Sequence, residues 1–155
     1  MKHGRLFSGT NKKYFASELV SYVAAAATAS ASAAITDRVI NSDLIITIIS
    51  TIIGSFGFFV GGMGTYAILN AAEYKSGRRN FPLDMKSMFI SNIQGIWATY
   101  LFRIPFQYLL QKFGITPSVA APIAQVVAGQ VGTAVRVYSN YRKKIFGIDA
   151  QNGKT

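Results

Sequence analysis

The sequence predicts an all-α protein of the cell membrane: a bundle of four transmembrane helices with both termini in the cytoplasm. Three observations predict this fold. Four long stretches of the chain carry almost no charge, most basic residues lie at alternate ends of these stretches, and the composition is 50% apolar with only 14% charged residues. An average soluble domain has about 25% charged residues. The chain of 155 residues therefore lacks the charges that a soluble surface needs.

The first two stretches are long enough to cross a membrane, for which a helix needs about 20 mostly apolar residues. Leu19–Thr36 is a run of 18 uncharged residues and predicts a span over 15–36. Leu44–Ala72 is a run of 29, rich in isoleucine and apolar around the whole helix circumference. A soluble helix would show a polar outer face, so a second span is predicted over 44–72.

The third and fourth stretches have similar lengths. Ser87–Gln111 is interrupted only by Arg103 and predicts a span over 86–111. Phe113–Val135 adds 23 uncharged residues and predicts a span over 117–139. The predicted division of the chain is a basic cytoplasmic N-terminal tail, a membrane domain and a flexible C-terminal tail: 1–13, 14–146 and 147–155.

The positive charge is unevenly placed along the chain. The net charge of +10 would suggest a nucleic-acid partner in a soluble protein. If the chain crosses four times, however, thirteen of the 16 basic residues fall on one side, and the positive-inside rule makes that side the cytoplasm. We therefore expect anionic lipid headgroups as partners and no nucleic acid. The thirteen are Lys2, Arg5, Lys12, Lys13, Lys75, Arg78, Arg79, Lys86, Arg136, Arg142, Lys143, Lys144 and Lys154.

A secretory signal peptide is the alternative for the first stretch. A basic start, an apolar run and the small residues Ala29–Ala34 resemble such a signal with its cleavage site. The first 18 residues are long and polar for a leader, and Glu18 is out of place in it. Cleavage would leave three spans with the termini on opposite sides, so we predict that the span is retained.

Small residues form stripes on two of the predicted spans. Because lipid tails are as apolar as leucine, helices associate in membranes by close packing and polar contacts. We expect both stripes to face other spans of the chain, with a homo-oligomer or a partner subunit as the alternative. The second span carries Ser50, Gly54, Gly57, Gly61 and Gly64, and the fourth carries Ala121, Gln125, Gly129 and Gly132.

The third span carries a polar stripe in which Thr99, Arg103, Gln107 and Gln111 recur every four residues. Polar groups in a membrane usually face the bundle interior or a water-filled cavity. Arg103 is predicted in the outer half of the bilayer, either in a structural contact or binding an anionic lipid or substrate. Pro105 predicts a kink or a break in this helix.

The acidic residues supply two expected ion pairs. Asp37 and Asp43, in the first outer loop, are the nearest candidates for Arg103. At the cytoplasmic end, Glu73 is expected to pair with Arg136 and to orient the helices.

Several classes of chemistry are excluded. The chain has no cysteine, which excludes disulfides, thiolate metal sites and a thiol nucleophile. Its one histidine, His3, lies in the N-terminal tail. No two carboxylates share a helix face, and neither a phosphate-binding loop nor a zinc-protease motif occurs. We therefore expect a protein that is not an enzyme and holds no metal or cofactor.

The second half of the chain shows a family pattern. Residues 109–117 read LLQKFGITP, a leucine-rich end followed by a Gly-x-x-Pro turn. The last span carries Ala124 and Gln125, and residues 140–146 read NYRKKIF, an Asn-Tyr pair followed by basic residues and Phe. This pattern resembles the last hairpin of the GtrA-like family of small four-span membrane proteins.

The resemblance implies a non-catalytic role in polysaccharide biosynthesis. Such a protein binds or translocates an anionic polyprenyl-phosphate-linked sugar, or tethers its glycosyltransferase. The alternatives are an assembly subunit of a larger membrane complex and, third, an anion channel built from several copies and lined by the third span. The candidate residues for binding lipid or substrate are Arg103, Gln107, Arg136, Arg142, Lys143 and Lys144, and those for helix packing are Gly54, Gly57, Gly61, Gly64, Gly129 and Gly132.

Overall fold

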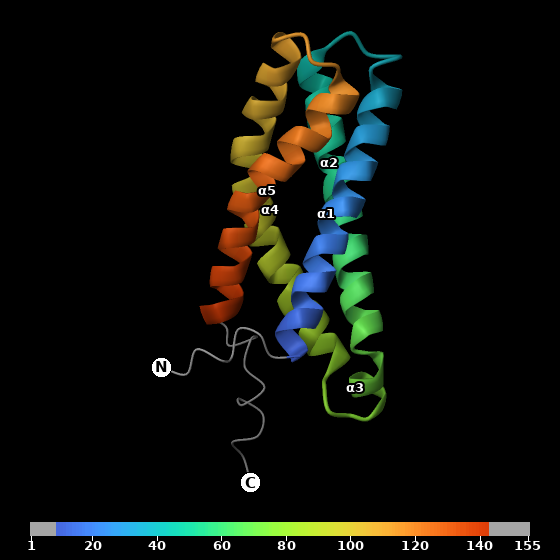
Figure 1. Cartoon of the computed structure of the whole chain (residues 1–155), viewed down its shortest axis with the longest axis vertical. Helices are drawn as coiled ribbons and strands as arrows, with labels where there is room; N and C mark the ends of the chain where they lie inside the picture. Colours follow the sequence, from blue (N-terminus) through green and yellow to red (C-terminus); the bar gives the residue numbers. More distant parts are fainter. Residues whose placement is uncertain (1–8, 143–155) are drawn as a thin grey trace.

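The chain folds into four long helices and one short helix, with no strand between residues 9 and 142 (Figure 1). The computed structural model describes these residues, and their side chains from Lys12 to Tyr138. The prediction of an all-α chain is confirmed. The helices are α1 (Gly9–Thr36), α2 (Asp43–Leu69), α3 (Ala71–Lys75), α4 (Phe81–Lys112) and α5 (Pro117–Arg142).

The helix ends differ from the predicted spans by a few residues. α1 already includes residues 9–13, which were assigned to the basic tail. α4 begins five residues before the predicted start at 86 because Asn80 caps it: the Asn80 side chain accepts a hydrogen bond from the Leu83 amide at 3.1 Å. The first tail before residue 9 and the predicted flexible tail at 147–155 lie outside the described residues.

Each long helix packs against at least two others, and α2 and α5 also touch each other. α1 packs extensively on α2 and α4 on α5, α1 also packs on α5, and the contact between α2 and α4 is the smallest of these four. The first turn of α1, the last turn of α5 and α3 lie at one end, which we call the α3 end (Figure 1). The loops 37–42 and 113–116 lie at the other, the loop end. Gly114 makes the second loop tight, since its φ of +86° is one that favours glycine.

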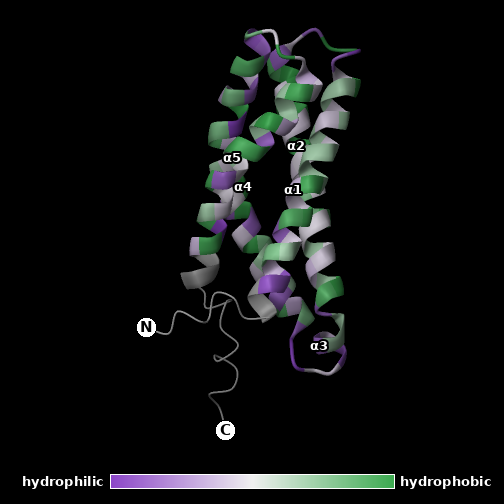
Figure 2. Cartoon of the chain, viewed as in Figure 1, coloured by the Kyte–Doolittle hydropathy of each residue, from purple (hydrophilic) through white to green (hydrophobic). Residues whose placement is uncertain are grey.

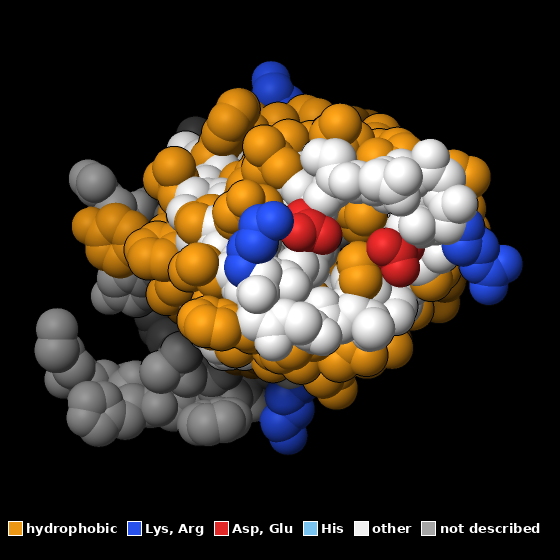
Figure 3. Space-filling view, turned by 90° about the horizontal axis from the view of Figure 1, so that it is seen from above, with side chains coloured by type: hydrophobic (Ala, Val, Ile, Leu, Met, Phe, Trp, Pro, Cys, Tyr) orange, Lys and Arg blue, Asp and Glu red, His pale blue; other side chains and the backbone are white. Residues whose placement is uncertain are grey.

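Hydrophobic residues predominate along the long helices, with hydrophilic ones at intervals among them (Figure 2). Of the buried side chains in the described part of the chain, more are polar or charged than apolar. At the loop end, polar and charged side chains gather in the centre of the face and hydrophobic ones surround them (Figure 3). Side chains such as Phe56, Trp97 and Leu101 are more than half exposed, whereas Thr47, Gln107 and Arg103 are fully buried. This distribution reverses that of a soluble protein and suits a lipid environment.

Three helices are long and apolar enough to cross a membrane: Lys12–Thr36 in α1, the whole of α2 and Pro117–Tyr138 in α5. These three are consistent with a multi-pass membrane protein. α4 is longer, but it is not among them, because its buried face carries polar residues that lower its mean hydropathy. Those residues are Ser91, Asn92, Thr99, Arg103, Gln107 and Gln111.

Glycine lets α2 approach α1 closely. A Cβ placed on Gly61 would lie 2.8 Å from the Cβ of Ala24, and one on Gly57 would lie 2.8 Å from the Ala24 carbonyl oxygen. Both positions therefore exclude any side chain. Gly64 differs: it is exposed, and a Cβ there would meet nothing within 4 Å. The prediction that Gly64 faces another helix of the chain is wrong, because α2 has turned this position outward.

Candidate functional site: two buried arginines

Two arginines lie in the interior between the long helices. Arg103 of α4 is 0% exposed and Arg136 of α5 is 2% exposed. Charged side chains are almost never fully buried unless they are paired, so the surroundings of each guanidinium group show what it does. The two sites differ in this respect.

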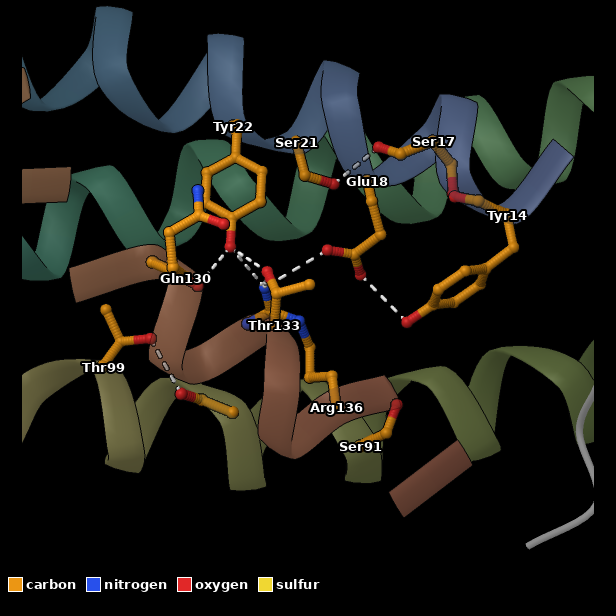
Figure 4. Close-up of polar contacts among 12 residues, drawn as sticks. Tyr14, Ser17, Glu18, Ser21, Tyr22, Ser91, Thr99, Gln130, Thr133 and Arg136 are labelled. Atoms are coloured by element: carbon orange, nitrogen blue, oxygen red, sulfur yellow. Dashed lines mark hydrogen bonds and ion pairs between the residues drawn. The ribbon is translucent and has the colours of Figure 1, made fainter. Parts of the chain in front are cut away.

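Arg136 forms an ion pair inside the protein. Its Nη2 lies 3.2 Å from a carboxylate oxygen of Glu18 on α1 and also donates to the Tyr22 hydroxyl and the Thr133 hydroxyl, at 3.1 and 2.9 Å (Figure 4). The other Glu18 oxygen accepts a hydrogen bond from Tyr14 at 3.0 Å. The charge of Arg136 is therefore neutralised by a partner on a different helix, and the pair joins α1 to α5.

The space around Arg136 is shaped for its side chain. The guanidinium carbon lies 4.3 Å from the centroid of the Phe58 ring, a favourable cation–π distance. A Cβ on Gly95 would lie 2.7 Å from Nη1, so this α4 position has to be glycine. Gly132, on the same face of α5, likewise leaves no room, since its Cβ would lie 2.8 Å from the Gly95 carbonyl oxygen.

The predicted ion pair between Glu73 and Arg136 is wrong. Glu73 lies on α3, beyond the end of α2, where it accepts a hydrogen bond from Lys13 at 2.5 Å and lies 3.7 Å from Arg79. Arg136 lies more than a turn inside its helix and faces α1. Glu18 is nine residues into α1, so it reaches the same depth.

Within the described part of the chain, Arg103 has no acidic partner. It donates to the side-chain oxygen of Gln125 on α5 and, at 3.2 Å, to the backbone oxygen of Ser50 on α2. No carboxylate of the described residues lies within 4.0 Å of it. The prediction that Asp37 or Asp43 pairs with Arg103 is wrong. Asp37 is exposed in the loop, and Asp43 pairs with Lys112 at 3.0 Å.

The polar stripe of α4 continues from Arg103 toward the loop end. Gln107 donates to the Ser50 hydroxyl at 2.9 Å, and the Thr47 hydroxyl donates to Gln111 at 3.3 Å. The prediction that this stripe faces the interior is confirmed. α4 stays helical through Pro105, so the predicted alternative of a broken helix is wrong.

Several buried polar atoms in this region lack a hydrogen-bond partner. Such atoms are rare in folded proteins, and each calls for an explanation. Of the five side-chain atoms of this kind in the described chain, four lie on the facing sides of α2 and α4 and one on Arg136. They are Thr51 Oγ1, Arg103 Nε, Gln107 Oε1, Gln111 Nε2 and Arg136 Nε.

A small cavity separates the two arginine sites. Its lining includes Tyr22, Ser55, Tyr100, Gln125 and Arg136. The space open to the centre of a water molecule is about 10 Å³, which suits one buried water. A phosphate group does not fit there in this conformation.

The α3 end carries a further group of charges. Arg79 pairs with Asp84 at 2.9 Å and lies 5.4 Å from the centroid of the Tyr66 ring. The hydrogen bond from Lys13 lowers the pKa of Glu73 below its usual value. Four other basic side chains at this end are exposed: Lys12, Lys75, Arg78 and Lys86. Arg142 ends α5, but its side chain, like Lys143 and Lys144, lies outside the description.

Glu18, Ser50 and Gln125 were not among the predicted site residues. Gln125 was assigned to a packing stripe, and its amide in fact accepts from Arg103. Its position on a mostly Ala and Gly face is the signal that marks it, because an amide in such a stripe needs a polar partner on another helix.

Comparison of the chain with models of protein families, with curated proteins and with solved structures found no match. The structure itself defines the class: an all-α chain with three helices able to span a membrane, an apolar exterior and two buried arginines.

Proposed function

We propose that this chain is a non-catalytic integral membrane protein with four spans that binds the phosphate of a polyprenyl-phosphate-linked sugar for its transfer across the membrane. The single observation that supports this function is Arg103, a buried cation with no carboxylate partner among the described residues. The resemblance of the last hairpin to GtrA-like proteins suggests the substrate class.

The fourth span in this proposal is α4. Its exposed face carries Ile93, Trp97 and Leu101, which suit contact with lipid tails. Its buried polar face is covered by α2 and α5, so Arg103 and Gln107 do not meet lipid. At 32 residues it is also longer than the roughly 20 that a span needs.

An unpaired buried arginine favours an anionic ligand. Removing a charge from water is costly unless an opposite charge compensates for it, and an ionisable residue within a membrane marks a functional site by default. The planar guanidinium group matches phosphate oxygens in a two-pronged hydrogen-bonding geometry. Arg136 is not part of this proposed site, because Glu18 already neutralises it.

The orientation follows from the surface charges. The exposed cations Lys12, Lys75, Arg78 and Lys86 lie near the α3 end, and basic residues are retained on the cytoplasmic side. Both termini are then cytoplasmic. Anionic inner-leaflet lipids attract each such residue by about 1 kcal/mol.

A vesicle assay tests the proposal. The protein is reconstituted in phosphatidylcholine vesicles with a fluorescent polyprenyl-phosphate sugar, and movement between leaflets is followed by quenching. We expect Arg103→Gln to reduce the rate at least tenfold and Arg103→Lys to retain part of it. Lys86→Gln, which removes an exposed cation, is the matched control. Equal rates for all variants and for empty vesicles would contradict the proposal.

An assembly subunit is the second candidate, and Gly64 favours it. Glycine on an exposed, otherwise apolar helix face lets a second helix approach closely. Native mass spectrometry in mild detergent would then show partner subunits or copies that Gly64→Leu removes. Partner retention in that variant would exclude this contact, and a glycosyltransferase among the lost partners would favour tethering.

A further inference from the structure

We infer that the lipid phosphate binds between α2 and α4 and enters sideways from the membrane when these two helices separate. We call this contact the α2–α4 seam; Thr47, Ser50, Thr51 and Ser55 form its α2 side, and Tyr100, Arg103, Gln107 and Gln111 its α4 side. The inference rests on the proposed function for the identity of the ligand, but not for the opening of the seam.

A route is needed because Arg103 is enclosed. Its side chain is 0% exposed, and its partners come from α2 and α5. A ligand therefore reaches the guanidinium group only if one of the four interfaces between neighbouring helices opens. The backbone contacts and polar bonds at these four interfaces indicate which of them opens most readily.

The α1–α2 and α4–α5 interfaces are held at the level of the backbone. Gly57 and Gly61 of α2 lie against Ala24 of α1, with no space for even a methyl group. Gly132 of α5 lies in the same way against the backbone of Gly95 on α4. A separation of about 1 Å already removes a quarter to a half of the dispersion attraction in such close contacts, so these interfaces resist opening.

The α1–α5 interface is held by a buried ion pair and by partly buried hydrogen bonds. Tyr22 of α1 donates to the backbone oxygen of Gly129, and Ser30 donates to that of Ser118 at 2.8 Å. The Glu18–Arg136 ion pair crosses the same interface. Opening it would leave both charges without partners.

The α2–α4 seam is different because side chains bridge it and their bonds are incomplete. It is the smallest of the four interfaces. Its buried or partly buried bonds are those of Ser50 to Arg103 and Gln107, of Thr47 to Gln111, and a contact of 2.8 Å between the Ser55 and Tyr100 hydroxyls. The one ion pair that the described residues form across it, between Asp43 and Lys112 at 3.0 Å, lies at its exposed rim, where ion pairs contribute little. Four side-chain atoms on its two sides have no partner at all. The closed seam thus leaves these four polar atoms without hydrogen bonds, and a bound ligand would supply partners for them.

The unpartnered atoms match a phosphate that carries a sugar. Arg103 Nε, the Thr51 hydroxyl and Gln111 Nε2 are donors, and phosphate oxygens accept from all three types. Gln107 Oε1 is an acceptor and suits a sugar hydroxyl. The isoprenoid chain stays in the lipid, since the seam opens toward the membrane.

Thiol reactivity tests the opening without any ligand, because the chain has no cysteine of its own. Ser50→Cys places a thiol in the seam, and Ser21→Cys places one at the α1–α2 interface; both serines are at most 1% exposed. Ser21 lies directly against Gly62. With a membrane-soluble maleimide we expect Ser50→Cys to react at least tenfold faster. Equal rates would overturn the inference.

A reversible cross-link tests the entry of the ligand. Asp43→Cys with Lys112→Cys spans the rim of the seam, where the native pair lies 3.0 Å apart, and Ser30→Cys with Ser118→Cys spans the α1–α5 interface. The probe is a polyprenyl phosphate in phosphatidylcholine vesicles. We expect a bifunctional thiosulfonate on the 43–112 pair to reduce binding at least tenfold, with recovery on reduction, and to have no effect on the 30–118 pair.

The outcomes separate the two proposals. Binding that the 43–112 cross-link leaves unchanged overturns entry through the seam and leaves the proposed function standing. No binding by the uncross-linked protein overturns the proposed function. In that case fast labelling of Ser50→Cys still supports the opening of the seam, with a ligand other than a lipid phosphate.

Discussion

At the scale of single residues, the two buried arginines show that burial alone does not define a role. The charge of Arg136 is neutralised by Glu18, whereas Arg103 has two neutral acceptors and no counter-charge among the described residues. We therefore expect the Arg136 guanidinium group to stabilise the fold, and we propose the Arg103 group as the one that binds a ligand. Loss of the Arg136 ion pair should lower the free energy of unfolding, whereas substitution of Arg103 should leave it unchanged or raise it.

Removal of the acidic partner of Arg136 should destabilise the protein. Glu18→Gln leaves a buried cation unpaired, which costs about 3–5 kcal/mol in known cases. We expect the free energy of unfolding in mixed detergent micelles to fall by about that amount. The double variant Glu18→Gln with Arg136→Gln should recover part of the loss; a further additive loss would show that the two charges do not interact.

Arg103→Gln should leave stability unchanged or raise it, because it removes a buried charge that has no acidic partner. Glutamine still offers a donor for the Ser50 backbone oxygen. The same unfolding measurement checks this, together with the transfer rate, which should fall. A loss of stability as large as that of Glu18→Gln would mean that Arg103 is a structural residue.

At the scale of the elements, close helix approach depends on where each glycine faces. Gly61→Ala should destabilise the α1–α2 pair by about 1–3 kcal/mol, as overpacking usually does, because its Cβ would lie 2.8 Å from that of Ala24. Gly64→Ala is the matched control on the same helix and meets open space. Unfolding in detergent should distinguish the two, and equal effects would contradict the packing described.

The α3 end should respond to acid. The hydrogen bond from Lys13 lowers the pKa of Glu73, so the carboxylate contributes stability that is present above its unfolded pKa and is lost as pH falls through the folded pKa. We expect the unfolding midpoint in detergent to decrease across that acidic range and the decrease to be smaller for Glu73→Gln. Lys75→Gln, which changes an exposed charge, should leave the pH profile as it is.

At the scale of the whole molecule, the proposed topology places the two ends of the helices on opposite sides of the membrane. Single cysteines at Arg78 and Lys112, which are both exposed, should therefore react with impermeant maleimide from opposite sides in oriented vesicles. Arg78→Cys is expected to label from the cytoplasmic side. Labelling of both from the same side would contradict four spans.

The four long helices could be predicted to within about six residues, because the uncharged length that marks them is a local property of the sequence. The Asn80 cap that starts α4 early and the short helix α3 were not predicted. The inward orientation of Arg103 and Gln107 was also predictable from their four-residue spacing. The ion pair between Glu18 and Arg136 was not predictable. The two residues are 118 positions apart, and whether they meet depends on how α1 and α5 are rotated about their axes. The outward position of Gly64 depends on the same rotation, which a regular glycine spacing does not determine.

The polar face of α4 has a consequence for biogenesis. An arginine opposes insertion of a lone helix by up to about 2.5–3.5 kcal/mol, the value at the helix centre on the biological scale. Of the four long helices, only α4 lacks the mean hydropathy of a membrane span. Its earlier neighbour α2 offers the Ser50 carbonyl, and the later α5 offers Gln125. The nascent segment is thus expected to stay near the translocon until the last hairpin emerges, and to leave for the bilayer together with it.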